Sequence, residues 1–140
     1  MTQLASSPLG KICIVNVHLD HAHQSKRKEL LEQVLTWLED KSRKSIPALI
    51  CGDFNVCGRR NITHYNDIKK MLVEKAGFER LKYTREKPNT STPATFVSQI
   101  GPFTLDYAFV RGQITGVVEV ISNKELSDHS ALVITLKPKQ

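Results

Sequence analysis

Polar residues capable of hydrolytic chemistry stand where apolar segments of this sequence end. His18 closes one apolar run, Asp53 and Asn55 follow a second, and Asp128 and His129 come immediately before a third. Carboxylate, imidazole and amide groups together can deprotonate a water molecule, orient a base and hold a charged oxygen. Because ligands of open α/β sheets bind beyond the strand ends, these positions predict a single site assembled from distant parts of the chain.

Asp106 is the most informative of the acidic residues. It lies within Thr-Leu-Asp-Tyr-Ala-Phe-Val, residues 104–110, which otherwise has the composition of a buried strand. A carboxylate in such a strand must find a cation, a hydrogen-bond donor or a histidine to offset the cost of its desolvation. His129 is a candidate partner for it.

A second group of polar residues, Asp20, His21 and His23, follows His18 closely. Imidazole groups suit zinc, but these residues would be divided between a strand end and a loop, and no cysteine completes a set of four ligands. An aspartate at a strand end is most often a turn or helix-capping residue. We therefore favour an ordinary loop here over a structural zinc site.

The elements that must position these side chains alternate between strands and helices. In the first predicted helix, apolar residues recur at helical spacing, and the basic run Lys26-Arg27-Lys28 is interpreted as a solvated face. A strand, a helix and a second strand in succession predict parallel pairing. The predicted strands cover residues 11–19, 48–51, 94–97, 104–110, 116–121 and 131–136, and the predicted helices cover residues 25–43 and 63–76.

Length and composition are those of one folded domain. The chain has 140 residues, 40% of them hydrophobic, and a net charge of +6 from 20 basic and 14 acidic residues. Its apolar stretches are far shorter than the roughly 18 residues of a membrane span, so no membrane span is expected. An odd number of cysteines without a CxxC pair cannot form a closed disulfide framework. With no export signal, this favours a reducing intracellular compartment, the cytoplasm or the nucleus.

Four short motifs, taken together, carry a resemblance. Val-Asn-Val-His18-Leu-Asp20, Gly52-Asp53-Phe54-Asn55, Leu105-Asp106-Tyr107 and Ser127-Asp128-His129 follow one another in this order. The series resembles the endonuclease/exonuclease/phosphatase superfamily of deoxyribonuclease-like, metal-dependent phosphoesterases, over about residues 11 to 136. Abasic-site endonucleases usually have a tyrosine at the position of His18. The sequence is therefore more similar to the deadenylase, sphingomyelinase and general phosphatase branches.

The resemblance implies a catalytic role for five residues. Asp53 would orient or deprotonate the attacking water, and Asn55 would hold a phosphoryl oxygen in the transition state. His129 would contact the phosphate, with Asp106 as its orienting carboxylate. His18 would stand beside the scissile phosphate as a hydrogen-bond donor or general acid.

The resemblance also implies a divalent cation, Mg²⁺ or Mn²⁺, with Asp128 as the residue nearest to it. Asn55, Arg59 and His129 would bind the substrate, and Arg59 belongs to a basic stretch that could grip a polyanion. The substrate would be a phosphoester: a nucleic acid, a phospholipid headgroup or a phosphorylated small molecule. The activity would be that of a phosphodiesterase or a phosphatase.

One departure from the family pattern concerns the residues before His18. The first half of the family domain supplies a metal-positioning Asn and a metal-ligand Glu on two strands, and nothing before His18 can be either. The resemblance therefore implies that residues 1–140 are a single, N-terminally truncated domain. Its fold would be the C-terminal half of a four-layer α/β/β/α sandwich, with one mixed β-sheet and helices on one face.

Two functions from different classes remain open. The chain is either a phosphoesterase, weak or inactive alone because the metal-ligand half is absent, or a catalytically dead phosphate-binding or regulatory module that pairs with another subunit. The resemblance leaves one sheet face bare, and soluble monomers rarely expose large apolar patches. Either the chain is a fragment or truncated isoform, or a partner chain covers that face. Nucleic-acid binding through charge alone ranks last.

Overall fold

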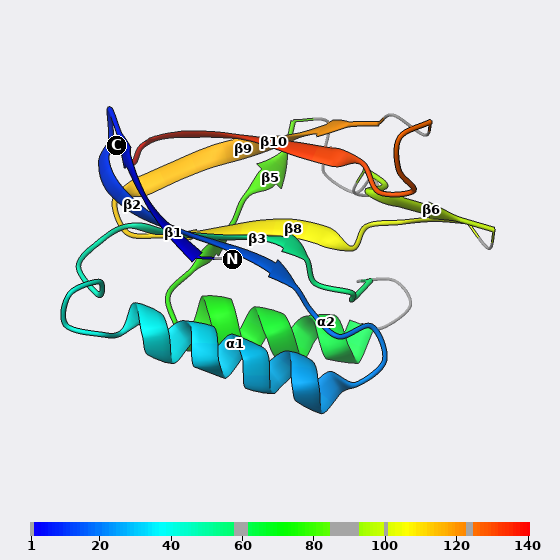
Figure 1. The fold of residues 1–140 in the computed structure, drawn as a ribbon, viewed down its shortest axis with the longest axis horizontal. Helices are drawn as coiled ribbons and strands as arrows, with labels where there is room; N and C mark the ends of the chain where they lie inside the picture. The colour runs from blue at the N-terminus through cyan, green and yellow to red at the C-terminus, as the bar shows by residue number, and fades with distance from the viewer. Residues whose placement is uncertain (1, 58–61, 85–92, 100, 123–124) are drawn as a thin grey trace.

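The computed structural model describes residues 2–57, 62–84, 93–99, 101–122 and 125–140, and arranges them in three layers (Figure 1). Helices form one outer layer, a five-stranded sheet forms the middle, and a three-stranded sheet forms the other outer layer. This arrangement confirms the predicted α/β class. Within the described ranges, no helix combines the length and the apolar character needed to cross a lipid bilayer.

The middle sheet contains both parallel and antiparallel pairs. Its central strands, β2 and β3, are parallel, and α1 (Gln24–Leu38) connects them, as predicted from the strand–helix–strand pattern. The other pairs are antiparallel. The strand order is β1 (Thr2–Ser7), β2 (Gly10–His18), β3 (Ala48–Asp53), β8 (Asp106–Arg111) and β4 (Glu79–Arg80).

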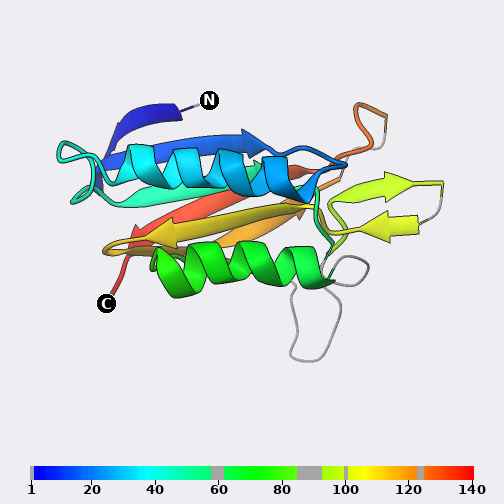
Figure 2. The ribbon, with the colours of Figure 1, turned by 90° about the horizontal axis from the view of Figure 1, so that it is seen from below.

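Both helices lie side by side on one face of this sheet, as predicted (Figure 2). The second helix, α2 (Ile62–Lys69), continues as a π-helical segment, η1 (Lys70–Lys75). The first ends at Leu38, earlier than predicted, because Asp40 starts a turn in which its carboxylate accepts the Ser42 N–H. The core between helices and sheet includes the fully buried side chains of Leu31, Leu38, Ile50, Phe54 and Phe109.

Arg27 corrects the interpretation of the basic run in α1. Its side chain is 1% exposed, whereas Lys26 and Lys28 lie at the surface or in part-exposed ion pairs. Arg27 stands four residues before Leu31 and therefore shares its inward face of the helix. The run is thus not a uniformly solvated face.

The strands after β8 form a second sheet instead of extending the first. Gly112, with φ at +95°, lies in the turn between β8 and β9, and β9 and β10 then pair antiparallel over eight positions across the other face of the middle sheet. The strand order is β10 (Ala131–Pro138), β9 (Ile114–Ile121) and β5 (Lys82–Tyr83). The expected single mixed sheet therefore accounts only for the middle layer, and the face expected to be bare is covered in part.

A separate hairpin projects beyond the layers near the start of β10 (Figure 1). It consists of β6 (Phe96–Ser98) and β7 (Gly101–Phe103), which pair antiparallel. The prediction of a short strand at residues 94–97 falls on β6. A single bridge between Phe96 and His129 connects this hairpin to the segment before β10.

Candidate active site

Three of the predicted site residues form one row across three strands. The register pairs His18 of β2 with Asp53 of β3, and Asp53 with Asp106 of β8. Directly paired residues point to the same face of a sheet. Because Cys51 and Ala108, two residues from the two aspartates, contribute to the core between the sheets, this row faces the second sheet.

His129 reaches the row from the segment before β10. Its Nδ1 lies 3.0 Å from Asp106 Oδ2, and its Nε2 lies 3.8 Å from Asp53 Oδ2. His18 Nε2 lies 3.6 Å from the same Asp53 oxygen. The two carboxylates are 13% and 12% exposed, whereas the His18 side chain is 81% exposed. The cluster is therefore buried on its Asp106 side and open to solvent at His18.

The turn after β3 fixes the position of Asp53. Gly52 has φ at +122°, and a Cβ atom there would lie 2.2 Å from Val17 O, so the backbone at this point requires glycine. Asp53 Oδ1 accepts the Asn55 N–H at 2.7 Å, and Asn55 Nδ2 donates to Leu19 O at 2.8 Å. Because an amide nitrogen carries two hydrogens, Asn55 can hold this loop and also donate to a ligand oxygen.

The surroundings of Asp53 favour its protonated form. Burial is the main cause and raises the pKa of Asp53 above its ordinary value, and the carboxylate of Asp106 raises it further. The Asn55 N–H and the imidazoles of His129 and His18 oppose this effect in part. A carboxylate with a raised pKa is a stronger proton acceptor, which suits it to act on a water molecule.

Two predicted residues are not part of this row. Asp128 is exposed and lines a small hollow of about 190 Å³, together with Val97, Ser127 and Ser130. Arg59 lies outside the described residues. The structure therefore brings together His18, Asp53, Asp106 and His129, with Asn55 attached through the turn after Asp53.

The loop containing Asp20 is held by hydrogen bonds among its own residues and to the first turn of α1. Asp20 Oδ1 accepts the N–H groups of Ala22 and His23 at 2.8 and 2.6 Å, and it lies 3.1 Å from His23 Nδ1. Arg27 Nη1 donates to Asp20 O at 2.6 Å. These contacts close the loop before α1.

The described side chains do not by themselves make a site for Mg²⁺ or Mn²⁺. Across the described ranges, no group of three or more His, Cys, Asp or Glu residues is arranged to hold a metal ion. One Asp106 oxygen faces His129, and one Asp53 oxygen lies between two imidazoles. A hard cation needs several oxygen ligands, so any metal site would require further ligands from water, substrate or other residues.

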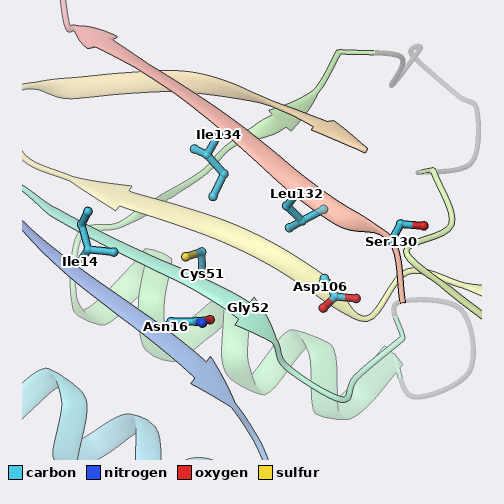
Figure 3. A pocket seen from close by; sticks show the side chains of 8 residues that line it. All are labelled: Ile14, Asn16, Cys51, Gly52, Asp106, Ser130, Leu132 and Ile134. Atoms are coloured by element: carbon cyan, nitrogen blue, oxygen red, sulfur yellow. The ribbon is translucent and has the colours of Figure 1, made fainter. Parts of the chain in front are cut away.

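A hollow of about 430 Å³ extends from the row along the inner face of β2 and β3 and under β10 (Figure 3). Asn16 was not predicted as a site residue, although it stands two residues before His18 and strand alternation places both on the same face. Thr95, fully buried beside Asp106, was also missed. The hollow is lined by Ile14, Asn16, Cys51, Gly52, Asp106, Ser130, Leu132 and Ile134.

Comparisons with known proteins agree with the fold. The model of the Endonuclease/Exonuclease/phosphatase family matches residues 5–129. A family protein from Leptotrichia buccalis C-1013-b has a TM-score of 0.70 at 16% identity, covering 97% of this chain and 52% of its own. One from Bacteroides vulgatus has a TM-score of 0.68 at 19% identity, with 92% and 50% covered.

A third solved structure is the mannosyl-6-phosphatase Bt3783 of Bacteroides thetaiotaomicron VPI-5482, with a TM-score of 0.55 at 18% identity, covering 91% of this chain and 51% of its own. The chain thus spans about half the length of the structures that it resembles. At these identities the likeness concerns the fold. No curated protein matches the sequence.

Proposed function

Because the chain belongs to the endonuclease/exonuclease/phosphatase family, we propose that it is a divalent-metal-dependent phosphoester hydrolase, a phosphodiesterase or a phosphatase. The observation that carries the proposal is the position of Asp53 between His18 and His129, with Asp106 paired to the second histidine. The phosphatase among the similar structures supports a hydrolase.

In the proposed reaction, Asp53 orients a water molecule and accepts its proton as the water oxygen attacks phosphorus. Asn55 Nδ2 and an N–H at His129 Nε2 donate to the phosphoryl oxygens, whose charge rises in the transition state. His129 Nδ1–H donates to Asp106, which fixes the direction of the ring. As the bond from phosphorus to the leaving oxygen breaks, His18 gives that oxygen a proton at the open side of the cluster.

Hydrolysis of bis(p-nitrophenyl) phosphate and p-nitrophenyl phosphate tests the proposal directly. We expect turnover with Mg²⁺ or Mn²⁺ and none with EDTA, and loss of turnover in Asp53→Ala and His129→Ala. His23→Ala is the matched control, because His23 contacts a carboxylate at a similar distance outside the row. Turnover that survives both site variants contradicts the proposal.

The second candidate is a catalytically dead phosphate-binding or regulatory module that pairs with another subunit. The hollow beside β10 favours it, because β10 is an edge of its sheet among the described residues and the chain spans about half of its structural relatives. The partner would be a chain that supplies the remaining half of this fold. Calorimetry with inorganic phosphate would then show binding that needs His129, without turnover of either ester.

The substrate class and the compartment are part of the same proposal. A nucleic acid, a phospholipid headgroup and a phosphorylated small molecule all present the phosphoester that this cluster would act on. The cysteines Cys13, Cys51 and Cys57 are free thiols, which favours the reducing cytoplasm or nucleus. Comparing diester with monoester hydrolysis separates phosphodiesterase from phosphatase activity.

A further inference from the structure

Thr95 connects the backbone of Asp106 to the segment that carries His129. Its side chain is fully buried. Its Oγ1 accepts hydrogen bonds from the backbone N–H groups of Leu105 and Asp106, both at 3.0 Å. Its carbonyl oxygen accepts the N–H of Ser130 at 2.7 Å. Thr95 therefore holds Asp106 directly and His129 through the adjacent residue.

The segment around Thr95 lies between β7 and the residues that precede β10. Thr95 N–H donates to Phe103 O at 2.8 Å, and Val97 N–H donates to Asp128 O at 3.0 Å. The Phe96 ring packs against the His129 imidazole, with centroids 4.8 Å apart. Backbone bonds on both sides of His129 and a ring contact at the imidazole thus start from the same short segment.

We propose that Thr95 is a positioning residue that sets the contact between Asp106 Oδ2 and His129 Nδ1. The significance of this role rests on the proposed function, since that contact aims His129 at the phosphate. Without the hydroxyl group, two N–H groups in a buried place lose their acceptor, and the start of β8 must move to find another. A hydrogen bond between two side chains weakens steeply when its distance or angle changes, so the pair would lose its fixed geometry.

Three variants separate the hydroxyl group from other properties of the residue. Thr95→Val keeps the shape and removes the acceptor, whereas Thr95→Ser keeps the hydroxyl group and removes a methyl group. Thr104→Val is the matched control, because Thr104 is also buried and its hydroxyl group donates to Pro93 O, whereas the Leu105 and Asp106 N–H groups donate to the Thr95 hydroxyl group. Circular dichroism would show that each variant is folded.

The deciding measurement is the NMR signal of the His129 Nδ1–H proton, on metal-free protein at one fixed pH. We expect a slowly exchanging signal in the wild type, Thr95→Ser and Thr104→Val, and its loss through exchange with water in Thr95→Val. A wild-type signal in Thr95→Val overturns the proposal. Loss in Thr104→Val also overturns it, because any missing buried hydroxyl group would then have the same effect. If Thr95→Val fails to fold, loss in folded Thr95→Ser overturns the proposal and retention supports it.

Hydrolysis of bis(p-nitrophenyl) phosphate separates this proposal from the proposed function. Loss of a group that orients a catalytic side chain typically costs about 10- to 100-fold, and we expect that loss in kcat of Thr95→Val with little change in KM. Thr95→Ser should restore most of the activity. If no protein in the series turns over but the NMR pattern holds, the positioning role stands and the proposed function fails. If the wild type turns over but the His129 signal is unchanged in Thr95→Val, the proposed function stands and the positioning role fails.

Discussion

Two of the carboxylate–imidazole contacts among the described residues have almost the same length but different surroundings. Asp20 Oδ1 lies 3.1 Å from His23 Nδ1, and Asp106 Oδ2 lies 3.0 Å from His129 Nδ1. The first pair lies three positions apart in the sequence, in the loop before α1. The second joins the start of β8 to the segment before β10.

The surroundings of the two pairs differ in burial and in the groups that hold each carboxylate. The Asp20 carboxylate is held by backbone N–H groups, chiefly those of His23 and Ala22, and these lower the pKa of Asp20 to about 2. Asp106 is buried and lies directly across from Asp53, whose pKa is raised. A short Asp–His distance therefore does not identify a site. Burial, a second carboxylate and a contact between distant parts of the chain distinguish the Asp106–His129 pair from the Asp20–His23 pair.

Removing the negative charge of Asp106 or of Asp20 should give the largest difference between the two pairs, measured as kcat. We expect Asp106→Asn to lower the kcat of phosphodiester hydrolysis about 100-fold or more, because His129 loses the acceptor that orients its ring. Asp20→Asn should leave kcat within a few-fold of wild type, since Asp20 lies outside the row. Parallel assays of the two variants make the comparison, and equal losses would show that both pairs serve the reaction.

Substitution of Arg27 tests whether the loop that contains the Asp20–His23 pair stabilises the fold. Its Nη1 donates to Asp20 O, and its Nη2 lies 3.0 Å from His64 Nδ1. Arg27→Ala should lower the free energy of unfolding by about 3 kcal/mol, because it leaves a cavity and a carbonyl group without its donor. Urea denaturation measures the change. Lys26→Ala, next in the chain and exposed, is the control and should stay within about 0.5 kcal/mol.

Asp53 and Asp20 should affect the pH dependence of the free energy of unfolding in opposite directions. The fold raises the pKa of Asp53 and so favours its protonated form. This stabilisation is complete below the ordinary value of 3.8 and is lost as the pH rises through the folded pKa. Asp53→Asn, which imitates the neutral form, should therefore be more stable than wild type at neutral pH and similar to it below pH 3.8.

Asp20→Asn should be less stable than wild type at neutral pH, because the fold favours the charged form of Asp20. Urea denaturation of Asp53→Asn and Asp20→Asn, at neutral pH and below pH 3.8, measures both changes in the free energy of unfolding. An Asp53→Asn protein that is less stable than wild type at neutral pH would show that its carboxylate stabilises the fold and is not held at a cost for function.

The sequence predicts most elements and the residues of the row, but not every contact that depends on closure of the fold. Helical spacing predicted both helices, and polar residues at strand ends predicted that His18, Asp53, Asp106 and His129 would meet. Arg27 was misjudged because its charge outweighed its spacing to the apolar stripe.

Closure of the fold also explains the other differences. Strand periodicity gives the two faces of β9 but not the sheet to which it belongs, so the second sheet was missed. The role of Thr95 could not be predicted, because its hydroxyl group meets the Asp106 N–H only once the hairpin has closed.

The smallest effect concerns the origin of the low pKa of Asp20. Backbone N–H groups contribute more to it than the side chain of His23, so in His23→Ala the carboxylate should still titrate near the wild-type value of about 2. Carboxyl-carbon NMR measures this titration. The corresponding stabilisation is present above the ordinary value of 3.8 and is lost as the pH falls through about 2, in the variant as in wild type. A return to the ordinary value in His23→Ala would make the imidazole the main cause, and the Asp20 contact would then be an ion pair and not a backbone turn.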